Sequence, residues 1–540
     1  MTPDEGTGQR ARRSRKGRRR GRRKRSTDPL ARARTIAREK LGIARLRPEQ
    51  ERALRALLDG RDTLAVLPTG YGKSLLYQTM ALTLDRPTIV VSPLIALMAD
   101  QQRALERRRL PVIRLDSSLR AAERRAALER LAAGGPLVVL TTPETLESSE
   151  IGQRIADAHP ALLTVDEAHC ISEWGHDFRP AYLRLGRQRE RLGEPQVLAL
   201  TATATPRVRE DIVARLKMSD AELVVAPPHR DNLRFSAHVV DGHGKLAVAG
   251  RLLRRLQRPG IVYCATTVEV DRVFRALERA RIPADHYHGK MRKADREAAQ
   301  ERYMRPTKRK VMVATSAFGM GIDKPNIRYV LHYQVPSSLE QYVQEAGRGG
   351  RDGRPCHCVL LFDPADVEVQ RHLLAQGRPR PDQLRRVAKA LAAWGGEQRT
   401  VKAADLASSA DVPVNAARAL CARLEELALV EQTAGEEWRI AVEPEVFDAG
   451  AEDLARRLEI ERLADERRLA VVREYAQTTE CRSVFLRRYF GEEDPPPCGN
   501  CDRCRAAAAA ARTMPAEKRG GKRGRRRRRR ARETSTNPDA

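Results

Sequence analysis

Short apolar runs alternate with Arg-, Glu- and Ala-rich stretches of helical composition from about residue 60 to residue 365. The runs are β-branched and apolar throughout, which is typical of strands buried on both faces of a parallel sheet. A first set lies at 63–68, 88–93, 136–143, 162–167 and 196–203, and a second at 260–266, 310–317, 328–333 and 356–362. The proline-containing stretch 226–235 separates them. The pattern predicts an α/β protein with two tandem parallel-sheet domains, 28–228 and 229–365, and a boundary near Pro228.

The pattern changes after Asp363. A helical stretch at 381–394 is followed by a helix, a turn, a second helix at about 414–427 and two short strands around Gly435. This order predicts a winged-helix-like domain at 380–442, whose second helix could enter a nucleic-acid groove. A small packing bundle without nucleic-acid contact is the alternative. A helical hairpin is expected at 452–490, leading into a cysteine cluster in a unit that spans 452–506.

Positive charge is concentrated at the two ends of the 540-residue chain, which has a net charge of +30. Residues 1–25 hold twelve Lys or Arg and residues 518–540 hold eleven, each set against two acidic residues. Such segments repel themselves and lack apolar residues, so we expect disordered basic tails at 1–27 and 507–540. They are interpreted as nucleic-acid-binding arms, with solubilising or localisation tails as the alternative.

Three classes of protein are excluded by what the sequence lacks. No run of 18 apolar residues occurs, which excludes a transmembrane helix, and the cationic first 25 residues have no apolar core of a secretory signal. Nine cysteines are too few for a disulfide scaffold. We therefore expect a cytoplasmic protein with an anionic partner and no membrane association.

A glycine-rich turn joins the first apolar run to a helical stretch. It reads TGYGKS and comprises Thr69, Gly70, Tyr71, Gly72, Lys73 and Ser74. Backbone N–H groups in such a turn cradle phosphates, with the lysine at the β/γ-phosphates and the serine hydroxyl on Mg²⁺. Leu67 stands where the general phosphate loop has glycine, and TGxGKS is the form found in helicases. The turn predicts an ATP and Mg²⁺ site.

A pair of carboxylates ends the apolar run at 162–167. Asp166 is placed to hold Mg²⁺, and Glu167 to polarise the attacking water. His169 could sense the γ-phosphate region. Gln50, upstream in the sequence RPEQ, could recognise adenine through its amide, and an ordinary surface side chain is the alternative.

Four cysteines near the C-terminus have metal-ligand spacing. Cys481 is followed after sixteen residues by Cys498, and Cys501 and Cys504 follow at intervals of two. Four thiolates at this spacing can close a tetrahedral zinc site, with the first on a helix and the others on a tight loop. A redox pair is the alternative. The other five cysteines lie in apolar contexts and are expected to be buried and inert.

Several motifs occur in an order that resembles superfamily 2 helicases: TGYGKS, DEAH, TAT (201–203), FGMGIDKP (318–325) and QEAGRGGRDG (344–353). The segment DEAHCISEWGHDFRPAY (166–182) is similar to the aromatic-rich loop of RecQ-family DNA helicases. RPEQ and the cysteine cluster also match that family, although Leu46 replaces the usual aromatic residue. The resemblance implies ATP-driven 3′→5′ unwinding of duplex DNA, a role in DNA repair and recombination, and a location at the bacterial nucleoid.

The resemblance also assigns roles to residues outside the phosphate loop. Arg348 and Arg351 would reach across the cleft from the second sheet domain as arginine fingers.

Five further residues would contact single-stranded DNA: Trp174, Phe178 and Arg179 in the aromatic-rich loop, and Ser92 and Thr142 at strand ends. Core packing is the alternative for the two aromatic residues, and helix capping for Ser92 and Thr142.

One departure from the family concerns domain order. The family commonly places the zinc module before the winged helix, whereas here the winged-helix-like segment comes first. Its short tip offers Trp438 as the sole aromatic candidate for strand separation. Two rival functions stay open, an RNA helicase of the same superfamily and a basic protein that binds nucleic acid without useful ATP turnover.

Overall fold

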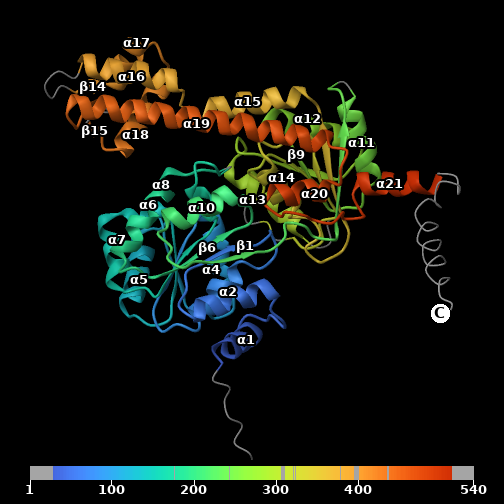
Figure 1. Ribbon diagram of the computed structural model, residues 1–540, viewed down its shortest axis with the longest axis horizontal. Coiled ribbons are helices and arrows are strands. Elements are labelled where there is room, and N and C mark those ends of the chain that lie inside the picture. The colour runs from blue at the N-terminus through green and yellow to red at the C-terminus, as the bar shows by residue number, and fades with distance from the viewer. Residues whose placement is uncertain are drawn as a thin grey trace, which may run out of the picture.

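The computed structural model describes residues 28–513, apart from 176, 243, 306–309, 320–321, 323, 378, 395–399 and 434–436. Its centre is two parallel sheets that follow one another along the chain (Figure 1). The first sheet is seven-stranded, in the order β3-β4-β2-β5-β6-β1-β7. Its strands are β1 (Thr63–Val66), β2 (Thr88–Val91), β3 (Val112–Leu115), β4 (Val138–Thr141), β5 (Leu162–Val165), β6 (Gln196–Thr201) and β7 (Glu222–Val225).

Helices cover both faces of the first sheet, because its central strands are apolar on both sides. These helices are α1 (Pro29–Glu39), α2 (Pro48–Leu58), α3 (Ser74–Ala81), α4 (Ile95–Arg107), α5 (Ala121–Ala132), α6 (Pro143–Glu147), α7 (Ser149–Asp157), α8 (Pro180–Leu183), α9 (Leu185–Arg191) and α10 (Pro206–Arg215), with a 3₁₀ turn, η1 (Ala168–Ile171). Residues of β1, β2, β5 and β6 enter two separate apolar clusters, one on each face.

The second sheet is six-stranded and parallel, in the order β10-β11-β9-β12-β13-β8. Its strands are β8 (Leu233–Val239), β9 (Gly260–Tyr263), β10 (Ala284–Tyr287), β11 (Val311–Ala314), β12 (Tyr329–His332) and β13 (Cys356–Phe362). The helices that follow its strands are α11 (Lys245–Arg255), α12 (Thr267–Arg279), α13 (Lys293–Met304) and α14 (Leu339–Ala346). The predicted class of two tandem parallel-sheet domains is confirmed.

A helical region with a small antiparallel sheet follows. It comprises α15 (Ala365–Gly377), α16 (Pro381–Trp394), β14 (Val401–Lys402), α17 (Ala403–Ala410), α18 (Val414–Glu426), β15 (Val430–Thr433) and β16 (Glu437–Ile440). The three strands pair in the order β14-β16-β15, which is the topology of a winged helix. Trp438 is only 4% exposed within the core of this unit, so it is not available at a wing tip.

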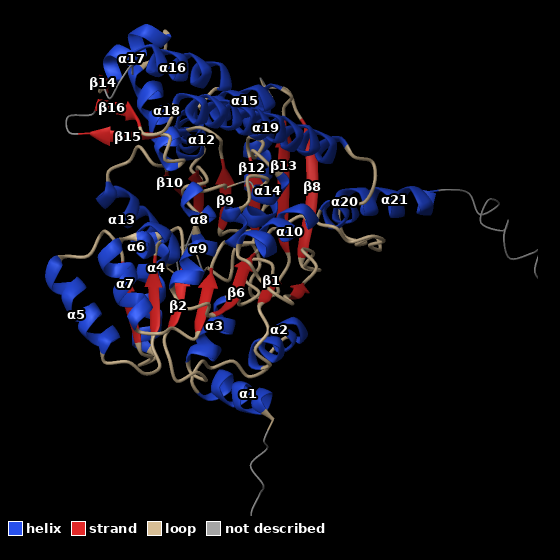
Figure 2. Ribbon diagram, turned by 60° about the vertical axis from the view of Figure 1, so that its left-hand side comes forward, coloured by secondary structure: helices blue, strands red, loops and turns tan. Residues whose placement is uncertain are grey.

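The predicted helical hairpin at 452–490 needs correction. One long helix, α19 (Pro444–Gln477), begins before 452 and is followed by α20 (Arg482–Tyr489) and α21 (Asp502–Thr513). The first half of α19 packs on α16, where Arg385 donates to Glu452 at 2.9 Å, and its second half packs on α15, where Arg371 donates to Glu466 at 2.8 and 3.0 Å. The winged-helix-like unit is therefore an insertion between two paired helices, held at the far end of α19 (Figure 2).

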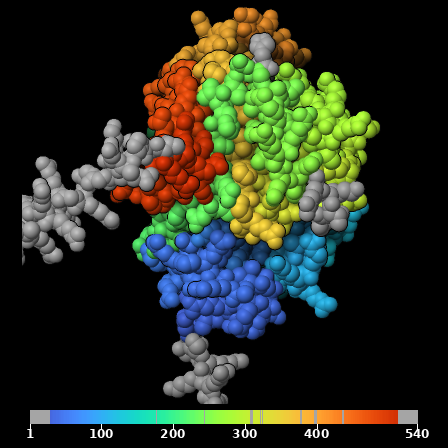
Figure 3. Space-filling model, turned by 90° about the vertical axis from the view of Figure 1, so that its right-hand side faces the viewer, coloured from blue at the N-terminus to red at the C-terminus, as the bar shows by residue number. Residues whose placement is uncertain are grey.

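The C-terminal helices lie against the second sheet domain, where the red segment adjoins the green surface in Figure 3. The backbone N–H of Ala237 in β8 donates to Asp502, which also pairs with the buried Arg482. Helix α21 continues to Thr513, so residues 507–513, which were predicted to belong to the disordered tail, are helical. Residues 1–27 and 514–540 lie outside the described part of the chain.

Within the described residues, no helix combines the length and the apolar character needed to cross a bilayer.

Candidate active site, DNA-contacting residues and zinc centre

The phosphate loop joins β1 to α3 at the carboxyl edge of the first sheet. Gly70 and Gly72 have φ angles of +80° and +87°, in the region that favours glycine, so the turn brings its backbone N–H groups toward one point. Ser74 is the first residue of α3, where helix N–H groups and the helix dipole favour phosphate. The pKa of Tyr71 is raised to about 12, mainly by burial and then by the hydrogen bond that the Tyr71 hydroxyl donates to Glu49.

The Gln50 side chain, from α2, packs against the backbone of the phosphate loop. It is 4% exposed, and its amide donates to the carbonyls of Tyr71 at 2.8 Å and Gly72 at 3.4 Å. Its Oε1 accepts from the backbone N–H of Arg47, whose guanidinium stacks on the Tyr71 ring. The alternative that Gln50 is an ordinary surface side chain is wrong, because the residue is buried and its amide is hydrogen-bonded to the backbone of the phosphate loop.

Asp166 and Glu167 follow β5 and lie beside the phosphate loop. Lys73 Nζ is 3.9 Å from Glu167 Oε1. The pKa of Asp166 is raised to about 6. Burial is the largest cause and the charge of Glu167 adds to it, while Lys73 acts in the opposite direction. Glu167 adopts a φ of 48°, which costs backbone strain in a non-glycine residue. Its buried Oε2 accepts no hydrogen bond from the described residues. These two carboxylates are suited to a divalent cation and a water molecule.

His169 connects the acidic pair to the TAT motif. It is 2% exposed, and its Nδ1 lies 3.0 Å from Thr201 Oγ1 and 3.4 Å from Glu167 Oε2. Thr201 in turn accepts from the backbone N–H of Thr203 at 3.2 Å. These contacts join His169 to the acidic pair, and its sensing of the γ-phosphate region stays a prediction.

The second sheet domain contributes Arg351 and Arg348. A Cβ built on Gly70 would lie 3.2 Å from Cγ of Arg351, so this side chain packs on the phosphate loop itself. Arg348 is 6% exposed and donates to the carbonyl of Gly319. Gly347 also approaches Thr69, with a built Cβ at 3.1 Å, so the two sheet domains meet at this loop.

Two residues missed in the sequence hold the arginine-bearing loop. Arg230 donates to the carbonyls of Gly347 and Gly349 at 3.0 Å, and Asn232 donates to that of Gly350 at 2.8 Å. Both lie in the stretch 226–235, which was interpreted only as a domain boundary. Each of these hydrogen bonds joins residues that are more than a hundred positions apart in the sequence, so no local sequence pattern indicates them.

The aromatic-rich loop belongs to the first sheet domain and contacts α19. The guanidinium of Arg207 is 3.2 Å from the centre of the Trp174 ring, and Arg468 of α19 donates to the Trp174 carbonyl at 3.1 Å. Trp174 is partly buried against the first-sheet core, so part of its surface packs as the alternative proposed. Arg179 donates to the Pro93 carbonyl at 3.1 Å.

Phe178 is half-buried, and the residues of its loop are mostly intermediate in exposure. It belongs to none of the apolar clusters of the described residues. Its ring is therefore better placed than that of Trp174 to meet a base.

The two strand-end hydroxyl residues differ from one another. Ser92 is fully buried after β2, and its Oγ has no hydrogen-bond partner among the described residues. Thr142 caps α6 by accepting from the backbone N–H of Thr145 at 3.3 Å, as its alternative interpretation states. Both lie at the carboxyl edge of the first sheet.

Helix α18 has weak charge complementarity to nucleic acid. Its exposed residues include Arg418, Glu425 and Glu426. Groove binding by this helix stays a prediction.

The four clustered cysteines converge at the junction of α20 and α21. Cys481 is the N-cap of α20 rather than a helical residue, and Cys504 lies in α21 rather than on the loop. The sulfur of Cys481 is 3.5 Å from that of Cys498 and 3.9 Å from that of Cys501. Tetrahedral zinc with Zn–S bonds of about 2.3 Å requires sulfur separations of about 3.8 Å. The cluster therefore fits zinc.

Hydrogen bonds favour the thiolate of Cys481, whereas burial is the largest cause that raises the pKa of Cys498 to about 11 and that of Cys504 to about 12. Burial opposes ionisation of Cys481, but N–H donors from Cys498 and Val484 prevail and lower its pKa to about 7. The backbone N–H of Cys504 donates to Cys501 Sγ at 3.4 Å. The other five cysteines are all buried, as expected.

Family models match three segments of the chain. They are DEAD/DEAH box helicase at residues 47–212, Helicase conserved C-terminal domain at 244–353 and RecQ zinc-binding at 451–505. The zinc-binding match and the cysteine geometry confirm the zinc prediction.

Relatives extend over most of the chain. It is 35% identical over 484 residues to the ATP-dependent DNA helicase RecQ of Bacillus subtilis, covering 89% of this chain and 68% of that one. It is 30% identical to the Haemophilus influenzae RecQ, with 87% and 63% covered. This chain spans about two thirds of the length of these relatives. A structure of the DUF1998 helicase MrfA bound to DNA matches with a TM-score of 0.52 at 19% identity, covering 78% of this chain and 63% of that one, and shows the fold alone.

Proposed function

Because this chain belongs to the RecQ family of ATP-dependent DNA helicases, we propose that it moves 3′→5′ along one DNA strand as it hydrolyses ATP. It is an ATP-hydrolysing enzyme that unwinds duplex DNA, and zinc is a structural cofactor. The observation that carries the mechanism is the contact of Arg351 with Gly70, since it joins the second sheet domain to the phosphate loop of the first.

ATP is held by the residues of the phosphate loop, Thr69 to Ser74, with Lys73 at its β/γ-phosphates. Gln50 acts as a support of this loop and as an adenine contact. Ser74 and Asp166 hold Mg²⁺, which neutralises charge on the phosphates when bound. The raised pKa of Asp166 supports this role, because a buried carboxylate gains most from a cation.

Glu167 polarises the attacking water and accepts its proton, and His169 senses the γ-phosphate region from beside that carboxylate. Arg351 and Arg348 stabilise charge that develops in the transition state, which makes hydrolysis depend on the approach of the two sheet domains. Opening and closing of the two sheet domains in each round of hydrolysis then moves the protein along the DNA strand.

The DNA strand runs over the carboxyl edge of the first sheet, past Ser92 and Thr142. Phe178 and Trp174 stack on bases and Arg179 holds the backbone, because aromatic and guanidinium planes suit bases of any sequence. The loop that carries them begins directly after Glu167, so DNA contact and hydrolysis share one segment.

We place the protein in the bacterial cytoplasm at the nucleoid, where it serves DNA repair and recombination. Its family membership and its DNA substrate support this setting.

An ATPase assay on the full chain, with and without oligo-dT, tests the function. The parent is expected to be stimulated by DNA, and Lys73→Ala and Glu167→Gln should each reduce turnover at least about 100-fold while DNA binding persists. The exposed residues Lys402 and Glu129 supply matched controls, Lys402→Ala and Glu129→Gln, which should behave as the parent.

Near-normal DNA-stimulated hydrolysis by Glu167→Gln would refute its role. Forked substrates with a 3′ or a 5′ tail determine the polarity. Equal stimulation by RNA would favour the RNA-helicase rival, and no ATPase activity in the parent would favour a basic protein without turnover.

A further inference from the structure

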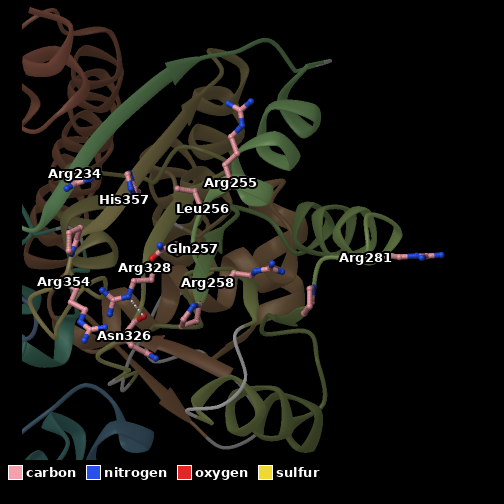
Figure 4. Close-up of a pocket in the computed structure, with 13 residues that line it drawn as sticks. Arg234, Arg255, Leu256, Gln257, Arg258, Arg281, Asn326, Arg328, Arg354 and His357 are labelled. Atoms are coloured by element: carbon pink, nitrogen blue, oxygen red, sulfur yellow. Dashed lines mark hydrogen bonds between the residues drawn. The ribbon is translucent and has the colours of Figure 1, made fainter. Parts of the chain in front are cut away.

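A basic groove of about 1010 Å³ lies on the second sheet domain (Figure 4). Its lining includes six arginines and no acidic residue: Arg234, Arg255, Arg258, Arg281, Arg328 and Arg354.

The arginines follow the order of the strands. Arg281 precedes β10, Arg258 precedes β9, Arg328 precedes β12, Arg354 precedes β13 and Arg234 lies near the start of β8. Because β10 and β8 are the two edges of this sheet, the cations form a row along its amino edge. Five strand spacings of roughly 4.8 Å give a row about 24 Å long.

Most of this charge is uncompensated. Arg328 pairs with Asp352, but none of the other five arginines has a carboxylate within 4.0 Å in the described part of the chain. His357, between them, adds no cation at neutral pH, since burial, Arg234 and Arg505 lower its pKa. Several like charges in one groove repel each other and favour an anion that spans them.

The groove is distinct from the sites described above. The phosphate loop, Ser92 and Thr142 lie at the carboxyl edge of the first sheet, whereas the groove lies at the amino edge of the second. Its inner end adjoins the arginine-finger loop, where the backbone N–H of Arg354 donates to Asp352 at 3.1 Å. From there the row leads outward to Arg281 (Figure 4).

We propose that this arginine row binds the phosphate backbone of a second DNA segment, separate from the strand on which the helicase moves. The choice of DNA rests on the proposed function. The length of the row supports a polymer, because a free phosphate or a nucleotide would meet only one or two of the arginines. Guanidinium groups suit this ligand, since their planar forks bind phosphate oxygens in pairs.

The test uses the full-length double variant Arg258→Gln/Arg281→Gln, which removes two charges at the outer end of the row. Binding of a labelled 30-base-pair duplex is titrated over several salt concentrations, with unlabelled oligo-dT saturating the translocation track. We expect affinity for the duplex to fall several-fold at low salt. The log–log salt slope should flatten by about 0.9 for each DNA phosphate that the variant no longer neutralises.

Arg251→Gln/Arg275→Gln is the matched control, because it removes two exposed arginines of α11 and α12 outside the groove. It should keep the parental slope. If the double variant of the row fails to fold, Arg281→Glu at an exposed position repeats the test.

A slope equal to that of the parent would overturn the proposal. So would micromolar tripolyphosphate displacing the duplex from the parent, since the row would then be a site for a small polyphosphate. ATPase stimulation by oligo-dT, measured on the same samples, reports separately on the proposed function and should be unchanged in the double variant.

Discussion

Asp166 illustrates how burial prepares a single residue for its chemistry. It is 7% exposed, and burial, followed by the neighbouring Glu167, raises its pKa to about 6 despite the attraction of Lys73. An ionised carboxylate at this position therefore costs folding free energy until a cation arrives. Affinity for Mg²⁺ should accordingly weaken as the pH falls through about 6.

The cost can be measured with Asp166→Asn. Because the pKa is raised on folding, the neutral carboxyl contributes stability fully below about pH 3.8, and this contribution disappears as the pH rises through about 6. In the absence of Mg²⁺ the variant should exceed the parent in stability at pH 8 by on the order of 2 kcal/mol, and match it near pH 4. Urea unfolding at both pH values tests this.

The exposed Asp59 supplies the control Asp59→Asn, which should show no such pH dependence. A stability difference between Asp166→Asn and the parent that is the same at both pH values would contradict the burial argument.

Single residues could be predicted where a motif specifies their chemistry, as for Lys73, Asp166 and Glu167, which the structure brings together. Prediction was weaker where a side chain had already used its hydrogen-bonding groups. Gln50 of α2 binds carbonyls of the phosphate loop more than twenty residues further along the chain, which sequence spacing does not indicate, whereas the cap made by Thr142 is the alternative that the sequence itself offered.

At the scale of elements, the strands that the sequence did not reveal share one property. In the two large sheets they are β3, β7, β8 and β10, which are the edge strands. An edge strand faces solvent on part of its surface, so polar residues interrupt its apolar pattern, as in Ala284–Tyr287. The central strands, buried on both faces, have continuous apolar runs and were all predicted.

The contact between α19 and the aromatic-rich loop yields a prediction at this scale. Arg468 is 8% exposed, pairs with Asp465 and donates to the Trp174 carbonyl. Arg468→Ala should release the loop, so we expect DNA stimulation of the ATPase to fall several-fold while hydrolysis without DNA persists. ATPase rates across an oligo-dT titration measure both quantities.

Arg473→Ala, at an exposed position of the same helix, is the control. Parental stimulation of the Arg468 variant would mean that α19 holds the loop without influencing its response to DNA.

At the scale of the whole molecule, the arrangement of units could not be predicted from local patterns. The winged-helix-like unit interrupts the pairing of α15 with α19, and Arg371 and Glu466, which join these helices, are ninety-five residues apart. The zinc module contacts both sheet domains, since Arg209 of α10 donates to the Phe490 carbonyl and Asn500 donates to that of Asp231. The arrangement of these units is therefore determined by contacts between residues far apart in the sequence.

The basic tails affect the molecule as a whole. Deleting 1–25 and 518–540 should leave turnover at saturating DNA nearly unchanged, because no site residue lies there, but should weaken DNA binding most at low salt. Each DNA phosphate that the tails no longer neutralise should flatten the salt slope by about 0.9 on duplex DNA or about 0.7 on single strands. Identical slopes for the full-length and truncated proteins would instead favour solubilising tails.

Helix α19 also has a mechanical consequence. Its 34 residues extend about 51 Å at a rise of 1.5 Å per residue, with one end fixed to the zinc module and the second sheet domain and the other carrying the winged-helix-like unit. It is therefore a lever arm. A tilt of 5° at the fixed end displaces the far end by roughly 4 Å over this length, close to the spacing of successive nucleotides in a duplex. Small rotations during each catalytic cycle would thus reach the distal unit as steps of nucleotide size.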